Sequence, residues 1–183
     1  MPTIIVLAAG ASKRLGRPKQ SLEFQGETLL ERAVRIASEV AQVVLVTTVG
    51  TGFSLYRLKP VPTVVINSDP EEGIASSIRV GVEATEGDVL FMLCDQPFIT
   101  ADHLKNLIDA KSPIAATGYN GISGVPAFFA AKYRAELLAL RGDVGAKQVI
   151  DRHRDELVTI PFEPAALDVD TAADYNSDPF QRS

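Results

Sequence analysis

The stretch that decides the fold reads Leu7-Ala8-Ala9-Gly10-Ala11-Ser12-Lys13-Arg14-Leu15-Gly16-Arg17-Pro18-Lys19-Gln20 and directly follows the apolar run Thr3 to Leu7. In α/β folds, the loop after the carboxyl end of a central strand is where ligands bind. Its small residues let backbone amides approach an anion closely. Four cations fall within seven residues of an otherwise acidic chain: Lys13, Arg14, Arg17 and Lys19. A phosphate chain is therefore the expected ligand.

This loop differs from two common phosphate-binding motifs. Gly10 and Gly16 have five residues between them, where a Walker loop has four, and no Ser or Thr follows Lys19. The loop also lacks the G-x-G-x-x-G pattern of dinucleotide-binding folds, which disfavours a hydride-transferring dehydrogenase.

Length and composition limit the remaining classes. The chain has 183 residues, 46% of them hydrophobic, which indicates one domain with a sizeable core. We expect this domain to span residues 1–176, followed by a polar tail over 177–183. A formal charge of −5 provides no basic field for nucleic acid. The amino terminus lacks the features of a signal peptide, the apolar runs are too short to cross a membrane, and Cys94 is the sole cysteine. We therefore expect a cytoplasmic protein.

Apolar runs alternate with amphipathic segments along the first half. Four runs predict strands buried on both faces: Thr3 to Leu7, Val43 to Thr48, Thr63 to Asn67 and Val89 to Cys94. Three helices are predicted between and after them, over Thr28 to Val40, Ile74 to Ala84 and Thr100 to Lys111. Thr28 and Glu31 have the spacing of a capping box, and Thr100 is a candidate N-cap. The pattern predicts a single-domain, Rossmann-like α/β fold: a mostly parallel sheet with helices on both faces.

The second half begins with a different pattern. Ile114 to Thr117, a turn at Gly118 to Gly121 and Gly124 to Phe129 predict a small hairpin-like β excursion on the substrate side. Two helical segments, Lys132 to Leu140 and Ala146 to Arg154, and a late strand, Leu157 to Pro161, follow it.

The pattern Leu-Ala-Ala-Gly-x-Ser-x-Arg-x-Gly-x-Pro-Lys after an amino-terminal strand resembles the signature of nucleotidyltransferases that join an NTP to a phosphorylated acceptor. Within them, the chain is most similar to the MobA-like and MocA-like enzymes of molybdenum cofactor maturation. Four further segments fall in the family's order: Leu93 to Pro97, Gly124 to Phe129, Gly142 to Ala146 and Asp168 to Thr171. The resemblance covers nearly the whole chain and implies the nucleotide-diphospho-sugar transferase type of fold.

The resemblance also implies a nucleotide site. The expected nucleotide contacts are Leu7, Ala8, Ala9, Gly10, Arg14, Lys19, Asn67, Gly73 and Ser77. Arg14 and Lys19 would hold the phosphates and, with Asp95, form the catalytic set. Asn67, Gly73 and Ser77 would lie near the base and ribose, because Glu72 to Ser77 resembles the family's E-G-x-x-S-S segment; helix capping is the alternative role for Gly73 and the serines. Guanine-using members tend to read Leu-Ala-Gly-Gly, so Ala9 favours CTP over GTP.

Two aspartates are the candidate metal ligands. Asp95 directly follows the strand Val89 to Cys94, and Asp170 follows a late apolar patch. Hard carboxylate oxygens from different strand ends suit Mg²⁺, and matching aspartates carry that metal in the family. A turn or N-cap role is the alternative for Asp95 and an N-cap role for Asp170, with Asp168 and Thr171 competing for either role of Asp170.

The expected reaction is attack by an acceptor oxygen on the α-phosphorus of the NTP, with pyrophosphate leaving. A phosphate acceptor is already ionised, so no strong general base is needed. We expect the two histidines, His103 and His153, on the surface and Cys94 in the core. Molybdopterin is the acceptor that the resemblance implies, and the expected acceptor-side residues are Gln96, Gly124, Pro126 and Asp143. Asp143 has helix capping as its alternative role.

Other functions remain open. The same motifs fit a transferase that uses GTP or another phosphorylated acceptor, such as a sugar or alcohol phosphate. A non-catalytic nucleotide-binding or cofactor-delivery module for a molybdenum hydroxylase is a further alternative. Retention of Arg14, Lys19, Asp95 and Asp170 together argues against such a module, since a carrier has no need of a metal pair.

Overall fold

A computed structural model of the chain describes residues 1–10, 18–50 and 54–168. Its centre is a seven-stranded sheet in the order β5-β4-β1-β6-β8-β7-β9. All strands run parallel except β8, which is antiparallel to both β6 and β7. The strands are β1 (Thr3–Leu7), β4 (Gln42–Thr47), β5 (Thr63–Ile66), β6 (Val89–Leu93), β7 (Ile114–Tyr119), β8 (Ile122–Phe129) and β9 (Leu157–Pro161). A separate short hairpin pairs β2 (Glu23–Phe24) with β3 (Glu27–Thr28).

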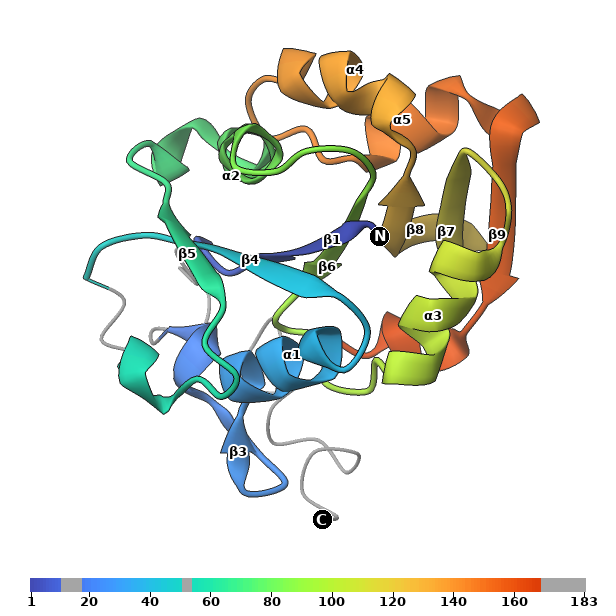
Figure 1. Ribbon diagram of the computed structural model, residues 1–183. Coiled ribbons are helices and arrows are strands. Elements are labelled where there is room, and N and C mark those ends of the chain that lie inside the picture. Colours follow the sequence, from blue (N-terminus) through green and yellow to red (C-terminus); the bar gives the residue numbers. More distant parts are fainter. Residues whose placement is uncertain (11–17, 51–53, 169–183) are drawn as a thin grey trace.

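Helices cover both faces of the sheet, as the sequence predicted (Figure 1). They are α1 (Leu29–Ser38), α2 (Ile74–Glu83), α3 (Ala101–Asp109), α4 (Arg134–Ala139) and α5 (Lys147–Arg152). α1 and α3 lie on one face, whereas α2, α4 and α5 lie on the other. The fold class is therefore confirmed: one α/β arrangement around a mostly parallel sheet. Within the described ranges, no helix is long and apolar enough to span a bilayer.

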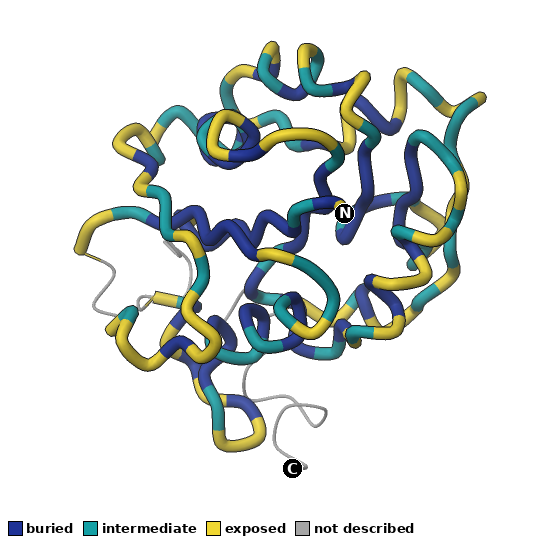
Figure 2. Tube along the Cα trace, in the orientation of Figure 1, coloured by how far each residue is buried: buried dark blue, intermediate teal, exposed yellow. Residues whose placement is uncertain are grey.

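The central strands are buried on both faces because neighbouring side chains point in opposite directions. Along β1, Ile4 and Val6 pack with α1 and α3, whereas Ile5 and Leu7 pack with α2. Figure 2 shows these inner strands as the buried centre of the molecule. Each fully buried aliphatic side chain contributes about 1.5 to 3 kcal/mol through removal from water. The two apolar layers therefore hold the sheet as a rigid platform for its loops.

Two helix starts follow the sequence patterns. Thr28 Oγ1 accepts a hydrogen bond from the Glu31 amide at 3.2 Å, and Glu31 Oε2 accepts one from the Thr28 amide at 2.7 Å. The predicted capping box is therefore present. Thr100 caps α3 by accepting from the His103 amide. α1 ends at Ser38, two residues before the predicted end.

The predicted hairpin is formed by β7 and β8. Asn120 and Gly121 both have positive φ, 48° and 72°, which is the backbone of the tight turn that Asn-Gly favours. The pairing shifts register between Ala116 and Thr117. The two hairpin strands lie between β6 and β9, so the predicted β excursion is part of the main sheet.

Two expectations from the sequence are wrong. Residues Thr63 to Ile66 are not buried on both faces, because β5 is an edge strand and its side chains are exposed or half-buried. His103 is not a surface residue: it is 3% exposed, stacks on Phe162 and places Nε2 2.8 Å from Thr117 Oγ1. It lies on the inner face of α3, and this burial lowers the pKa of the imidazole to about 4.

Candidate active site

The site begins where β1 and β6 end side by side. These parallel strands pair Leu7 with Leu93. The segment Ala8 to Gly10 leaves β1 at the same edge where Asp95 follows β6. The register of two buried strands thus brings the small-residue loop and the carboxylate together, although they are far apart in sequence. This edge is the usual ligand crevice of parallel α/β sheets.

Lys19 and Asp95 form an ion pair at this edge. Lys19 Nζ lies 3.0 Å from Asp95 Oδ2, and the two side chains are 15% and 16% exposed. The other carboxylate oxygen, Asp95 Oδ1, is buried and finds no hydrogen-bond partner among the described residues. A buried oxygen of this kind is costly unless a donor or cation satisfies it. The structure therefore joins the predicted catalytic lysine to the predicted metal aspartate and leaves one oxygen for a ligand.

Gln20 anchors the segment that carries Lys19, and the sequence interpretation missed it. Its side chain is 2% exposed, and Nε2 lies 2.5 Å from the Ala8 carbonyl oxygen and 3.5 Å from that of Gly10. Lys19 and Gln20 share one short 3₁₀ turn, Lys19–Ser21. The position of the lysine thus depends on the small-residue loop itself. The signal for Gln20 in the sequence was its position directly after Lys19. A polar residue at that position fits an exposed turn equally well.

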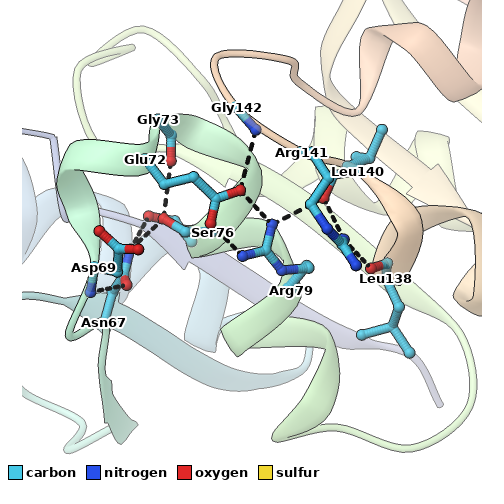
Figure 3. Close-up of polar contacts among 11 residues, drawn as sticks. Asn67, Asp69, Glu72, Gly73, Ser76, Arg79, Leu138, Leu140, Arg141 and Gly142 are labelled. Atoms are coloured by element: carbon cyan, nitrogen blue, oxygen red, sulfur yellow. Dashed lines mark hydrogen bonds and ion pairs between the residues drawn. The ribbon is translucent and has the colours of Figure 1, made fainter.

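Asn67 fixes the serines at the start of α2. Its side chain is 1% exposed, and Nδ2 donates to Ser76 Oγ at 2.8 Å and to Ser77 Oγ at 2.9 Å. Its Oδ1 accepts from the Asp69 amide at 2.9 Å (Figure 3). Both the nitrogen and the oxygen of the Asn67 side-chain amide therefore have hydrogen-bond partners within the protein. Its effect on a ligand would pass through the orientation of the Ser77 hydroxyl.

Gly73 brings the expected nucleotide and acceptor segments into contact. It precedes α2 with φ +119°, a conformation that L side chains rarely adopt. A Cβ at this position would lie 2.6 Å from Gly142 C and 2.7 Å from Asp143 N. The glycine thus caps the helix and also permits a close backbone approach. The two roles considered for Gly73 are compatible, and Asp143 lies directly beside it.

Three of the four expected acceptor residues, Gln96, Gly124 and Pro126, lie in or against β8, whereas Asp143 lies beside Gly73. Gln96 is 6% exposed, and its Nε2 donates to the Ala165 carbonyl at 3.0 Å and to the Val125 carbonyl at 3.3 Å. Gln96 Oε1 is buried without a partner in the described part of the chain. Since two carbonyls face Nε2, the amide can only place its oxygen toward the remaining space. The Pro126 carbonyl accepts from Thr117 Oγ1 at 2.6 Å.

Gly124 and the aromatic side chain of Tyr119 are also close. A Cβ on Gly124 would lie 2.7 Å from the Tyr119 hydroxyl oxygen. Burial raises the pKa of Tyr119, and the negative charges of Asp168 and Asp95 raise it further. Asp168 and Asp95 are therefore both within electrostatic reach of this hydroxyl. Gln96 directly follows Asp95 and links this segment to β8 through its hydrogen bond to the Val125 carbonyl.

The family assignment follows from a comparison over most of the chain. Residues 4–157 match the MobA-like NTP transferase domain. The chain belongs to this family. It is a nucleotidyltransferase of the MobA-like type.

Named relatives of this MobA-like protein differ in activity. It is 31% identical over 188 residues to the nicotine blue oxidoreductase of Paenarthrobacter nicotinovorans, with 92% of each chain covered. It is 24% identical over 176 residues to the molybdenum cofactor cytidylyltransferase of Escherichia coli strain K12, covering 93% of this chain and 92% of that one.

Solved structures show the same fold. The crystal structure of Rv0371c from Mycobacterium tuberculosis H37Rv superimposes with a TM-score of 0.83, at 30% identity and 96% coverage of both chains. A structure of Rv0371c in complex with manganese has a TM-score of 0.77, at 28% identity and coverage of 94% and 95%. Use of a divalent metal is therefore compatible with a MobA-like protein.

The described residues of the MobA-like site offer one good metal ligand. Asp95 Oδ1 is a buried hard oxygen with no hydrogen-bond partner among these residues, which fits Mg²⁺ or Mn²⁺. Within residues 1–10, 18–50 and 54–168, no group of three His, Cys, Asp or Glu residues is placed to hold a metal. Two predicted participants, Arg14 and Asp170, lie outside the described residues, as do Lys13, Arg17, Thr171 and the tail 177–183.

The structure places the remaining candidates, Cys94 and the two histidines, in packing or hydrogen-bonding contacts. Cys94 is buried in the core as expected, and burial raises the pKa of its thiol. His153 is half-exposed, with Nε2 2.7 Å from Glu136 Oε1. His103 Nε2 is hydrogen-bonded to Oγ1 of Thr117 in β7. Neither histidine belongs to the Lys19–Asp95 region, which agrees with a reaction that needs no histidine base.

Proposed function

We propose that this protein transfers a nucleotidyl group from CTP to the phosphate of a molybdopterin-type acceptor and releases pyrophosphate. The observation that carries the proposal is the Lys19–Asp95 pair next to the small-residue loop, in which one carboxylate oxygen of Asp95 has no hydrogen-bond partner among the described residues. This arrangement offers one cation for phosphate oxygens and one hard oxygen for a metal. The name of the E. coli relative supports molybdopterin and CTP.

Ala9 supports the choice of CTP. It is 3% exposed and follows β1 in the segment where guanine-using members of the family tend to have Gly. A methyl group there leaves less room beside the backbone. The smaller pyrimidine ring fits such a site better than a purine does.

The nucleotide roles that we propose follow the sequence interpretation except at Asn67, which was expected as a contact and here acts through Ser77. The proposed contacts are Leu7, Ala8, Ala9, Gly10, Arg14, Lys19, Gly73 and Ser77, with Asn67 orienting Ser77. Gln96, Gly124, Pro126 and Asp143 are proposed for the acceptor. Gln96 supports this proposal because its Oε1 is buried and has no hydrogen-bond partner in the described part of the chain. Asp143 supports it by its position against Gly73.

The chemistry needs positioning and charge neutralisation more than acid–base catalysis. An ionised oxygen of the acceptor phosphate forms a bond to the α-phosphorus, and the bond from that phosphorus to the bridging oxygen breaks as pyrophosphate leaves. Lys19 neutralises charge on the phosphoryl oxygens and so stabilises the transition state. Asp95 and the proposed ligand Asp170 would hold Mg²⁺, which supplies Lewis-acid stabilisation of phosphate oxygens when bound.

The test is pyrophosphate release with each of the four NTPs, Mg²⁺ and purified molybdopterin. We expect turnover with CTP that Lys19→Ala and Asp95→Ala lower by about 10²-fold or more, whereas Lys105→Ala, on the exposed face of α3, leaves it unchanged. Turnover with GTP alone would contradict the nucleotide choice. Nucleotide binding without turnover, also with sugar and alcohol phosphates as acceptors, would favour a delivery module for a molybdenum hydroxylase.

A second candidate arises from the relative named nicotine blue oxidoreductase, which is similar over nearly the whole chain. It predicts oxidation of NADH or NADPH by a suitable dye. The absence of the G-x-G-x-x-G pattern from the first loop disfavours this reaction. Cofactor oxidation that persists in Lys19→Ala, together with no pyrophosphate release from the wild type, would establish this candidate over the transferase.

A further inference from the structure

Glu72 and Arg79 form a two-pronged ion pair beside the proposed nucleotide segment. Arg79 Nη1 lies 2.7 Å from Glu72 Oε1, and Nη2 lies 2.5 Å from Oε2. Glu72 ends the 3₁₀ turn Pro70–Glu72 just before Gly73, and Arg79 lies within α2. Their side chains are 23% and 20% exposed. The planar guanidinium thus holds the carboxylate in one orientation.

The same two side chains also bind the loop between α4 and α5. Arg79 Nη1 donates to the Leu140 carbonyl at 2.8 Å, and Glu72 Oε1 accepts from the Gly142 amide at 3.0 Å (Figure 3). The Gly142 carbonyl in turn accepts from the Ala75 amide at 3.2 Å. The loop is therefore tied to the first turn of α2 through both its carbonyl and amide groups.

We propose that Glu72 and Arg79 are positioning residues that hold the acceptor-side loop 140–143 against the nucleotide-side start of α2. This inference rests on the proposed function, since it takes Gly73 and Ser77 as nucleotide residues and Asp143 as an acceptor residue. The ion pair contacts neither substrate. It sets the distance between the two segments that must bring the acceptor phosphate to the α-phosphorus.

The charge state of the pair suits a permanent brace. The hydrogen bond from Arg79, together with that from the Gly142 amide, lowers the pKa of Glu72 to about 2. The carboxylate therefore stays ionised at any pH at which an enzyme assay is run. Arg141 reinforces the same loop, because its Nη1 donates to the Leu140 and Leu138 carbonyls at 2.7 and 2.8 Å.

Arg134 provides a matched control. It lies in α4 and ties that helix to the opposite end of α2, where Nη2 donates to the Val82 carbonyl at 2.9 Å and Nη1 to Thr85 Oγ1 at 3.2 Å. Arg134→Gln therefore removes a similar arginine contact to the same helix, away from Gly73 and Asp143. A purely structural role of Arg79 predicts the same consequences for both variants.

The first experiment measures amide hydrogen exchange of the ligand-free variants Arg79→Gln, Glu72→Gln and Arg134→Gln. We expect the Gly142 and Ala75 amides to exchange about tenfold faster in the first two variants and at the wild-type rate in Arg134→Gln. Unchanged exchange at both amides in Arg79→Gln would overturn the brace. Arg79→Lys, which keeps the charge but not the two-pronged contact, is expected to lie between wild type and Arg79→Gln.

The second experiment measures steady-state kinetics with CTP and molybdopterin. We expect Arg79→Gln to lower kcat/KM for the acceptor at least tenfold while the dissociation constant for CTP changes less than threefold, with Arg134→Gln close to wild type. Equal kinetics for the two variants would overturn the positioning role. Wild type without turnover would contradict the proposed function instead, and the exchange result would still decide whether the brace exists.

Discussion

Lys19 Nζ lies 3.0 Å from Asp95 Oδ2, although 76 positions separate the two residues in the sequence. The contact depends on β1 and β6 ending together, with Leu7 opposite Leu93. The proposed function assigns phosphate oxygens to the lysine and a metal to the aspartate. Substitutions at this pair, and at the residues that hold it in place, should therefore change both activity and stability.

Removing the lysine tests its role in the reaction. We expect Lys19→Ala to lower kcat by about 10²- to 10³-fold, because the charge on the phosphoryl oxygens loses its cation. Lys19→Arg keeps the charge with a different geometry and should retain part of the activity. The measurement is initial-rate kinetics at saturating nucleotide, with Lys105→Ala as the control. A kcat for Lys19→Ala within threefold of wild type would remove Lys19 from the catalytic set.

Gln20 is expected to matter for both stability and activity. Gln20→Ala leaves the Ala8 carbonyl without its side-chain donor and releases the turn that carries Lys19. We expect the free energy of unfolding to fall by about 1 to 3 kcal/mol and kcat to fall as well. Chemical denaturation and steady-state kinetics measure the two effects. Gln148→Ala, on the exposed side of α5, is the control, and equal results for the two variants would contradict an anchoring role.

Gly73 combines an unusual backbone angle with a close contact, and a second glycine separates the two effects. Gly87 has φ +75° with nothing within 4 Å of the point that a Cβ would occupy, whereas the Gly73 position is crowded by Gly142 and Asp143. Strain of this backbone type costs about 1 kcal/mol or more per residue. We expect Gly87→Ala to lower only stability, and Gly73→Ala to lower stability further and to weaken CTP binding. Calorimetric titration with CTP provides the comparison, and normal CTP affinity in Gly73→Ala would count against the nucleotide segment.

His103 makes stability depend on pH. Its pKa is about 4 in the folded protein because it is buried, against about 6.5 when exposed. As pH falls below 6.5, the unfolded chain binds a proton that the folded protein does not, so the free energy of unfolding decreases until about pH 4. The total loss is on the order of 3 kcal/mol. Denaturation at several pH values should show this slope in wild type and in His153→Asn, and a weaker slope in His103→Gln; equal slopes in all three would contradict it.

The sequence predicted most of the platform because local patterns determine it. The apolar run Thr3 to Leu7 and the capping box at Thr28 each depend on short-range rules that hold in the structure. Burial was harder to predict, because it depends on where a strand lies in the sheet. Thr63 to Ile66 has the composition of an inner strand but lies at the edge, and His103 looks like a surface residue until α3 packs on the β7–β8 hairpin.

The site was predictable in residue types and less so in contacts. Lys19 and Asp95 stood out from motifs, and the strand register explains why they meet. Gln20 and Glu72 stood in quoted segments, but their contacts and those of Arg79 were not predicted, because these contacts involve carbonyls and amides of distant loops. Such contacts have no periodicity in sequence. The role of Asn67 beside the ligand stays a prediction, and the hydrogen bonds from its Nδ2 to Ser76 and Ser77 were not foreseen.

The most direct test of nucleotidyl transfer at the Lys19–Asp95 pair follows the α-phosphate itself. CTP labelled at the α-phosphorus is incubated with molybdopterin, Mg²⁺ and either wild type, Lys19→Ala or Asp95→Ala, and the label is located by chromatography. We predict that wild type moves the label onto molybdopterin and that each variant does so more slowly by about 10²-fold or more. Label that remains in CTP, or that appears only as free CMP, with wild-type protein would contradict the account.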